Sequence, residues 1–485
     1  MNDERKWNCR THYQRKAHQE IDYIFLTLLP REGLSIREEQ VKLSHEMLNA
    51  LMDGKIALCD AGVGIGKTYA YLVACILMRR YSAALHQSYF CDHRPIVIST
   101  SSIALQEAIL KEYLPFLSNV FLKAGLIESS LKAVVRKGKE HFVCDYRLDI
   151  RLEAIREKAK NEKQKAALMS LRNIYDMDEV ANLSNFDRRL VCVPKFCPKE
   201  CPGRNSCRYQ TYLRQSKDPE ILFQICNHNY LLADASHRAK GYRPLLSTYR
   251  ALIVDEAHKL PEAARQMYGK CLSFDDIQEI CFFLEQEHLA KEARQLNAVF
   301  HNLFHVIYEN HVTRAGLSQE FRRTEECVLV LEEGKRSLLD FSERLKNAMP
   351  GWDKNRLEEA MEVLCLFQNP GKWDVLHLEH EKGKLPQLCV TSRKIPDLLS
   401  SMLWSQGFPA ILTSGTLKAG NGFGRTKQET GLETDQRVQE YVAYSPFNYK
   451  QNCLLYLPRT LKRTRHGSPE EAEILAKHIQ RLICS

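Results

Sequence analysis

Residues 55–80 read KIALCDAGVGIGKTYAYLVACILMRR and carry the strongest indication of the fold in this 485-residue chain. A short apolar run at 56–59 enters a glycine-rich turn, and a long apolar stretch leaves it. The pattern predicts a buried strand, a loop and a helix in direct succession, which is the setting that a phosphate-binding loop needs. We therefore expect an α/β domain built around this unit.

The loop itself carries the residue types that bind a nucleoside triphosphate. Its glycines let backbone N–H groups come close to phosphate oxygens, and the helix that begins near Lys67 directs the positive end of its dipole at them. We predict that the ammonium of Lys67 reaches the β- and γ-phosphates of ATP and that the hydroxyl of Thr68 ligates Mg²⁺. The predicted nucleotide-binding residues of the loop are Asp60, Ala61, Gly62, Val63, Gly64, Ile65, Gly66, Lys67 and Thr68.

A second motif, Asp255-Glu256-Ala257-His258, ends the apolar run at 251–254. Hydrolysis of a phosphoanhydride needs a carboxylate that holds Mg²⁺ and a group that orients the attacking water. Asp255 suits the first task and Glu256 the second, and His258 is expected to relay the nucleotide state to neighbouring motifs. The same four residues could begin a solvated helix, but their combination with a phosphate loop favours the catalytic interpretation.

Two weaker features fit the same site. Arg37 and Gln40 lie ahead of the loop, where a glutamine can read the edge of adenine, although residues of these types are common on helix surfaces. A second strand is predicted at 95–100, and ligands gather at the carboxyl edge of such sheets. The residues there that could touch a nucleic-acid backbone are Thr100, Leu105 and Gln106.

The predicted strands at 56–59, 95–100, 251–254 and 410–413 alternate with helical patterns, which indicates a doubly wound α/β domain. Two long segments interrupt it. The first is rich in Lys, Arg and Cys and poor in strand signals, and the second is mostly helical in pattern. We divide the chain at 1–120 (phosphate loop), 121–225 (first insertion), 226–262 (acidic motif), 263–395 (second insertion), 396–420 (last part of the first domain) and 421–485 (start of a second domain).

The chain has 17 cysteines, and most are scattered singly among apolar residues. The first twenty residues lack the apolar core of a secretory signal, and no apolar run approaches the length of a membrane span, so we expect a reducing, cytoplasmic setting. Disulfides are rare there, and isolated thiols act as small buried hydrophobes. The cysteines interpreted in this way are Cys59, Cys75, Cys226, Cys281, Cys365 and Cys389.

One group of cysteines is clustered. Cys197, Cys201 and Cys207 lie close together, and Cys144 stands upstream. Four thiolates can hold zinc or an iron–sulfur cluster, and the paired C-x2-C knuckles of a zinc ribbon are missing. We therefore predict a [4Fe–4S] cluster on these four residues, with Cys192 as a fifth candidate ligand and free thiols as the alternative.

Net charge offers weak support for a nucleic-acid partner. The chain carries 69 Lys and Arg against 60 Asp and Glu, a formal net charge of +9. This excess is compatible with binding a polyanion and equally with an ordinary solvated surface.

Taken together and in this order, the motifs resemble the DinG/XPD-like family of superfamily 2 DNA helicases. The resemblance covers nearly the whole chain from about residue 17. Alanine at the first position of the phosphate loop is typical of helicases. The motifs that carry the resemblance are R-x-x-Q (37–40), AGVGIGKT (61–68), STSSIALQ (99–106), KGKEHFVC (137–144), the three-cysteine cluster, ICNHNYLLAD (225–234), IVDEAH (253–258), LTSGTL (412–417) and SPFNYKQNCLLYLP (445–458).

The resemblance implies a RecA-like motor domain that carries an iron–sulfur insertion at 121–225 and a helical arch at 263–395. It implies ATP-dependent 5′-to-3′ translocation on single-stranded or forked DNA with duplex unwinding, in repair or replication. In such families the cluster lies beside the point of strand separation. Basic residues near it, which could hold phosphates or form a solvated face, are Lys132, Arg136, Lys137, Lys139, Arg204 and Arg208.

The sequence departs from the family in one respect. Superfamily 2 motors close ATP between two RecA-like domains, and the second normally supplies an arginine. Since 421–485 holds only the start of a second domain, we expect a truncated chain that binds ATP weakly and does not unwind DNA alone, unless a separate chain supplies the missing half. A non-catalytic DNA- or partner-binding module is the alternative, and a P-loop nuclease or transporter ATPase is disfavoured by LTSGTL and the cysteine insertion.

Overall fold

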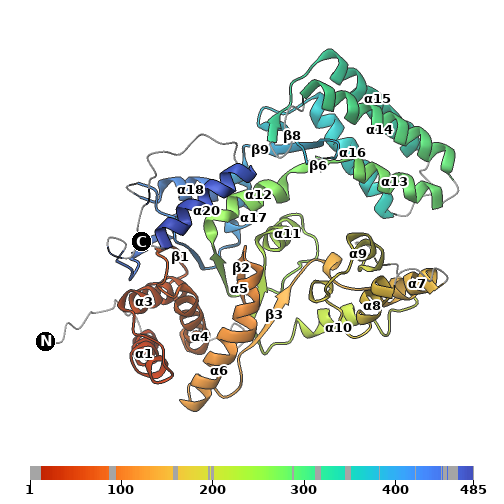
Figure 1. The fold of residues 1–485 in the computed structure, drawn as a ribbon. Helices are drawn as coiled ribbons and strands as arrows, with labels where there is room; N and C mark the ends of the chain where they lie inside the picture. Colours follow the sequence, from red (N-terminus) through yellow and green to blue (C-terminus); the bar gives the residue numbers. More distant parts are fainter. Residues whose placement is uncertain are drawn as a thin grey trace.

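A seven-stranded parallel sheet forms the centre of the computed structural model (Figure 1). Its strands, in spatial order, are β11 (Val438–Ala443), β1 (Ile56–Ala61), β10 (Ala410–Ser414), β5 (Ala251–Asp255), β2 (Ile96–Thr100), β4 (Ile221–Cys226) and β3 (Lys132–Arg136). The structure describes residues 12–86, 94–156, 162–194, 197, 201–286, 289–311, 318–344, 351–381, 383–420, 422–448, 451, 456 and 468–483.

The central strands are apolar on both faces because helices cover both. Alternate residues of β1 divide between the two layers: Ala57 and Cys59 pack in one hydrophobic cluster, and Ile56 and Leu58 in the other. The first layer contains α1 (His12–Tyr23), η1 (Ile24–Leu28), α2 (Leu29–Arg31), α3 (Glu38–Met52), α4 (Lys67–His86), α5 (Ile103–Ala108), η3 (Ile109–Tyr113) and α6 (Leu114–Lys123). The second layer contains α11 (His228–Ala239), η6 (Ala257–Lys259), α12 (Leu260–Tyr268), α17 (Ile395–Met402), η7 (Trp404–Gln406) and α18 (Gly424–Thr430).

The α/β class predicted from the sequence is confirmed, and so are the strands at 56–59, 95–100, 251–254 and 410–413. The boundaries of the first insertion differ from the prediction. The stretch 121–225 contributes β3 and β4 to the central sheet, so the interruption runs from 137 to 220. It holds η4 (Lys139–His141), α7 (Asp145–Arg156), α8 (Glu162–Ser170), η5 (Met177–Glu179), α9 (Asn185–Val191) and α10 (Arg208–Gln215).

The boundary at 421 also differs. We expected 421–485 to begin a second domain, but β11 pairs in parallel with β1 along its whole length, from Ile56↔Val438 to Ala61↔Ala443. Residues 438–443 therefore belong to the first sheet. Beyond them the structure describes the helix α20 (Pro469–Ile483), which has no buried residues.

The second insertion is not only helical. Its helices are α13 (Phe274–Gln286), α14 (Ala290–His311), α15 (Glu325–Arg344) and α16 (Gly351–Gln368), which pack around one apolar cluster. They are joined by an antiparallel sheet that the sequence did not predict, with strands in the order β6 (Lys270–Leu272), β9 (Gln387–Ser392), β8 (Asp374–Glu379) and β7 (Ser318–Glu320). Figure 1 shows this unit apart from the central sheet and joined to it through α12 and β9. Within the described residues, no helix is both long and apolar enough to cross a membrane.

Candidate nucleotide-binding site

The phosphate loop and the acidic motif meet at the carboxyl edge of the central sheet. Lys67 begins α4 directly after the loop, and Glu256 follows β5. Parallel pairing of β1 and β5 with the intervening β10 brings both strand ends to one edge, where Lys67 Nζ lies 3.4 Å from Glu256 Oε1. Residues separated by nearly the whole first insertion are therefore in direct contact, as the predicted shared site requires.

Asp255 is held below this contact in a buried position, and the residue is only 2% exposed. The hydroxyl of Tyr71 donates to Oδ2 over 3.4 Å, and the backbone N–H of Glu256 donates to Oδ1 over 2.9 Å. Burial raises the pKa of Asp255 to about 6, against the opposing effect of the Lys67 charge. The carboxylate is thus fixed by two donors and poised for a cation.

The acidic motif is linked to the SGTL motif through a chain of hydrogen bonds. Ser414 donates its hydroxyl proton to Glu256 Oε2 over 3.2 Å, and His258 Nδ1 lies 2.7 Å from the same Ser414 oxygen. Since a hydroxyl has one proton, His258 must donate from Nδ1 when Ser414 donates to Glu256. Glu256 adopts a left-handed backbone conformation with φ of 52°. This conformation is strained for a residue other than glycine, and such strain is common at functional sites. The end of β10 is therefore bonded directly to Glu256 through Ser414.

Two residues that were predicted to bind the nucleotide, Asp60 and Gln40, instead form hydrogen bonds that support the phosphate loop. Asp60 Oδ1 accepts from the backbone N–H of Leu417 over 2.8 Å, which ties the start of the loop to the SGTL motif. Gln40 is 6% exposed and donates from Nε2 to the carbonyl of Gly66 over 2.8 Å. The amide nitrogen of Gln40 is thus used inside the protein and does not face adenine as predicted. Arg37, in contrast, is exposed and lies beside Gly66.

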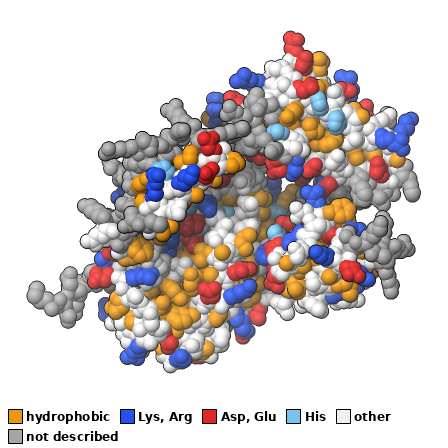
Figure 2. Space-filling model, in the orientation of Figure 1, with side chains coloured by type: hydrophobic (Ala, Val, Ile, Leu, Met, Phe, Trp, Pro, Cys, Tyr) orange, Lys and Arg blue, Asp and Glu red, His pale blue; other side chains and the backbone are white. Residues whose placement is uncertain are grey.

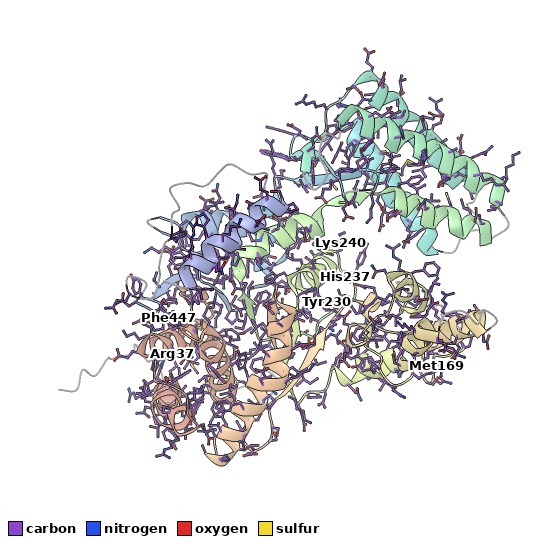
Figure 3. All side chains as sticks on the ribbon, viewed as in Figure 1. Arg37, Met169, Tyr230, His237, Lys240 and Phe447 are labelled. Carbon is purple, nitrogen blue, oxygen red and sulfur yellow. The ribbon has the colours of Figure 1, made fainter. Side chains whose placement is uncertain are left out.

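The segment at 445–447 covers the loop, which the sequence did not reveal. Ser445 donates its hydroxyl to the carbonyl of Val63 over 2.8 Å. A Cβ placed on Gly64 would lie 2.3 Å from Cε2 of the Phe447 ring. Figure 3 labels Phe447 and Arg37 at this edge of the molecule, one from each end of the chain. Glycine is required at 64 both for its φ of +84° and for this close approach.

We expect Gly64→Ala to weaken ATP binding by about tenfold or more, because it adds left-handed backbone strain of about 1–2 kcal/mol to a clash with Phe447. Gly54→Ala is the matched control, since Gly54 has a φ of +70° but nothing within 4 Å of the added carbon. Titration with a fluorescent ATP analogue measures both. Equal affinity in the two variants would show that the Phe447 contact and the loop geometry do not matter.

The residues expected to touch a nucleic-acid backbone are mostly inside the protein. Thr100 is fully buried at the end of β2, and Gln106 is 5% exposed. Behind them His228, from the ICNHNYLLAD motif, lies with Nδ1 2.7 Å from the hydroxyl of Ser99. Burial lowers the pKa of His228 to about 4, so its ring is neutral and acts as a support under the acidic motif.

The cysteine-rich loop brings its thiols into one region. Electrostatic interactions link Cys144 to Cys201, and Cys197 to both Cys201 and Cys207. Cys144 and Cys207 pack on the aromatic cluster of Phe142, Val193, Tyr209 and Tyr212. Cys192 packs in a different cluster and forms a backbone bridge with Val143, and its thiol also interacts electrostatically with Cys144. Among the described residues, no three of these sulfurs lie within 4.8 Å of one another.

Most of the basic residues near this loop pair with other groups of the protein, and whether they hold phosphates stays a prediction. Arg136 is 4% exposed and donates to the hydroxyl of Tyr230 over 3.2 Å and to the carbonyl of Leu245 over 2.8 Å. The others that pair with carboxylates are Lys132 with Glu220, Lys137 with Asp176 and Arg208 with Asp145. On the face in Figure 2, Lys and Arg are interspersed with Asp and Glu.

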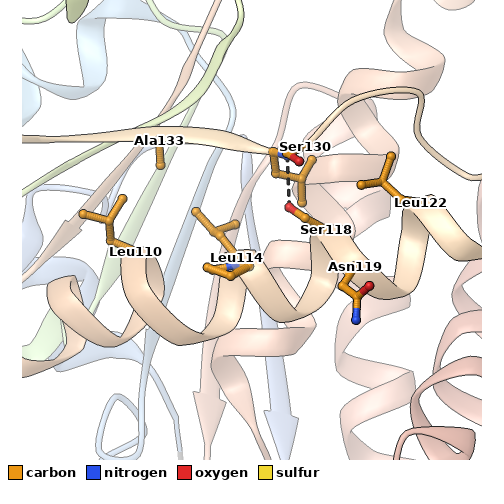
Figure 4. A pocket seen from close by; sticks show the side chains of 9 residues that line it. Leu110, Leu114, Ser118, Asn119, Leu122, Ser130 and Ala133 are labelled. Atoms are coloured by element: carbon orange, nitrogen blue, oxygen red, sulfur yellow. Dashed lines mark hydrogen bonds between the residues drawn. The ribbon is translucent and has the colours of Figure 1, made fainter.

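A pocket of about 410 Å³ lies elsewhere, between α6 and β3 (Figure 4). Leucines and an alanine line most of it, and Ser118 accepts a hydrogen bond from the backbone of Leu131 over 3.0 Å. No titratable side chain lines this pocket. It therefore offers no chemistry to the site at the sheet edge.

The fold and the loop define the class of protein, a P-loop nucleotide-binding protein with a parallel α/β core. No family model matches the chain. It is 22% identical over 462 residues to the ATP-dependent DNA helicase YoaA of Haemophilus influenzae, a match that covers 89% of this chain and 67% of the relative. It is 23% identical over 466 residues to the ATP-dependent DNA helicase DinG of Photobacterium profundum, covering 82% and 64%.

The chain is thus similar in sequence to helicases of the DinG and YoaA type, and it spans about two thirds of the length of these curated relatives. YoaA of Escherichia coli is similarly related, with 23% identity over 93% of this chain and 70% of the relative. A solved structure of Xpd4 from S. tokodaii matches 84% of this chain and 60% of its own, with a TM-score of 0.39 and 14% identity.

Proposed function

We propose that the chain is the nucleotide-binding part of an ATP-dependent DNA helicase that moves 5′ to 3′ on single-stranded or forked DNA. The observation that carries the proposal is the convergence of Lys67, Asp255 and Glu256 at one sheet edge. The relatives named as ATP-dependent DNA helicases support the choice of DNA as the partner. A cytoplasmic location and a role in DNA repair or replication belong to the same proposal.

Each residue of the site has a task in this proposal. Lys67 and the backbone N–H groups of the loop neutralise and orient the phosphates. Asp255 supplies the carboxylate for Mg²⁺, and Glu256 accepts a hydrogen bond from the attacking water. Ser414 and His258 couple the position of Glu256 to β10, so that nucleotide state and the rest of the motor can influence each other. A second motor domain, in the same polypeptide or a separate chain, would supply the opposite wall and its arginine.

A [4Fe–4S] cluster held by Cys144, Cys197, Cys201 and Cys207 is part of the proposal. The donor set fits it, because Cys197 interacts electrostatically with Cys201 and Cys207, Cys144 interacts with Cys201, and four thiolates are the ligands that such a cluster takes. A bound cluster would organise the irregular loop between α9 and α10, and supply electron-transfer chemistry. Cys192 packs beside Val143 but also interacts electrostatically with Cys144, so it stays a candidate for the fourth position.

We expect the anaerobically purified protein to be brown with about four irons per chain. Cys201→Ser should lose most of the iron, whereas Cys192→Ser should keep it, since Cys192 faces the other hydrophobic cluster. Colorimetric iron and sulfide analysis measures both. Stoichiometric zinc without iron would exclude the cluster. Loss of iron in Cys192→Ser would show that Cys192 is a ligand in place of Cys144.

The function is tested with DNA-stimulated ATP hydrolysis and with unwinding of duplexes that carry a 5′ or a 3′ tail. We expect the 485-residue chain to bind ATP, and a form that contains a second motor domain to unwind only the 5′-tailed duplex. DNA binding without ATP binding in either form would establish the non-catalytic module instead. Unwinding of the 3′-tailed duplex would reject the direction.

A further inference from the structure

A row of potential metal ligands crosses the antiparallel sheet of the second insertion. Strand pairing places Cys389 of β9 directly opposite Cys271 of β6 on one side and His377 of β8 on the other. Directly opposed residues in antiparallel strands point to the same face, so all three side chains share one face. Glu379, two positions beyond His377, is on this face too. Cys389 is therefore not the isolated buried thiol that its sequence neighbours suggested.

The opposite face of the same strands supplies the apolar core. Leu272, Leu378, Leu388 and Val390 alternate with the row and pack in the hydrophobic cluster of the insertion. The alternation separates a core face from a face that carries sulfur, imidazole and carboxylate groups. The strand register, and not the local amino-acid composition, brings the residues of this second face together.

The distances suit a single cation. One ligand atom from each of His377, Glu379 and Cys389 lies within 4.8 Å of the others. Cys271 Sγ lies 3.2 Å from Cys389 Sγ, and the two sulfurs of a zinc site with Zn–S bonds of about 2.3 Å lie about 3.8 Å apart. His377 Nε2 lies 3.6 Å from Glu379 Oε1. Cys271 is outside the group of three and contacts Cys389, so its side chain would rotate toward His377 and Glu379 to complete a tetrahedral site.

Burial and charge also favour a cation. Cys389 is 1% exposed, and the side chain of His377 is 16% exposed. The Glu379 carboxylate and the two sulfurs on the same face would together stabilise a divalent cation.

We propose that Cys271, Cys389, His377 and Glu379 form a binding site for a thiophilic divalent cation of the zinc class. Two sulfurs, one imidazole and one carboxylate are the donor set and number that Zn²⁺ takes in tetrahedral sites. The site is separate from the four clustered cysteines and does not rest on the proposed helicase function.

The metal would link the first and last strands of the second insertion. The chain enters this unit through β6 and leaves it through β9, and the two cysteines are 118 residues apart in sequence. Closing so long a loop restricts the unfolded chain, and binding to the native state alone adds stability by mass action. The metal would fix where the inserted unit joins α12 and α17.

The test measures zinc and iron separately in the full chain, and then titrates Zn²⁺ against a chromophoric chelator. We expect about one zinc per chain, lost in Cys271→Ser and His377→Ala. Glu379 is exposed, so Glu379→Gln keeps the fold and should weaken zinc affinity about tenfold. Cys365→Ser, a thiol of the same unit outside the row, should bind as the parent does, and Cys201→Ser should keep this zinc.

Two results would overturn the proposal. Unchanged zinc content in both Cys271→Ser and Glu379→Gln would place the metal elsewhere. A protein without zinc whose intact mass is lower by two hydrogens, and which recovers them on reduction without taking up zinc, would establish a Cys271–Cys389 disulfide instead.

Discussion

Lys67→Ala is expected to lower kcat/KM for DNA-stimulated ATP hydrolysis by about 10³-fold in a form that contains both motor domains. The ammonium lies 3.4 Å from Glu256, at the edge where the loop and the acidic motif meet. Removing it leaves the developing phosphate charge without its fixed cation. The effect should fall on turnover more than on DNA binding, because the contact is made with the nucleotide.

A surface lysine provides the comparison. Lys111→Ala removes a side chain that is 64% exposed and pairs only loosely with Glu107, at 3.9 Å. It should leave hydrolysis within about twofold of the parent, since such pairs contribute little. Steady-state ATPase rates with and without single-stranded DNA measure both variants. If the ATPase rate of Lys67→Ala stays within about tenfold of the parent, the phosphate loop has no essential role in hydrolysis.

The central sheet and its site could be predicted because the signals are local. Strands buried on both faces are continuous apolar runs, as in 251–254, and the loop after β1 needs glycines at fixed positions. The meeting of Lys67 with Glu256 followed from parallel pairing, which brings strand ends to one edge. The strand and loop signals are local, whereas the contact between Lys67 and Glu256, 189 residues apart, depends on the pairing of distant strands.

The antiparallel sheet of the insertion could not be predicted in the same way. β6 and β7 have three residues each, too few to show alternation, and β8 is only partly buried. The neighbouring segments have helical patterns, so the short strands leave no clear signal of their own in the sequence. The pairing of Cys271 with Cys389 is decided by register across 118 residues, which no local pattern contains.

The supporting contacts of the site were missed for a related reason. Tyr71 lies in an apolar helix, and its hydroxyl reaches Asp255 only because α4 packs against the sheet. Phe447 reaches Gly64 because β11 returns the chain to the first sheet, whereas the sequence suggested a second domain there. Both depend on how the elements pack.

Asp255→Asn should lower ATP hydrolysis by about 10²-fold or more and, at neutral pH, stabilise the protein free of nucleotide and Mg²⁺. The carboxylate is 2% exposed, and burial raises its pKa from 3.8 to about 6. A shift of this size corresponds to about 3 kcal/mol of destabilisation once the group is ionised. The amide cannot accept from both Tyr71 and the Glu256 N–H, and a lost hydrogen bond costs about 1 kcal/mol. The net gain is expected at about 1–2 kcal/mol.

The pH dependence separates this effect from a general change in packing. The native carboxyl keeps its proton up to about pH 6, whereas the unfolded one loses it near 4, so the parent loses stability as pH rises between these values. The amide of the Asp255→Asn variant cannot ionise, so the stability difference should change from a small deficit at about pH 4, where the lost hydrogen bond dominates, to the full net gain by about pH 7. Urea unfolding across this pH range measures it, with Asp149→Asn, which removes a half-exposed carboxylate paired with Arg172, as control. A difference that is constant with pH would mean that Asp255 carries no ionisation penalty, and that its fixed orientation comes from packing alone.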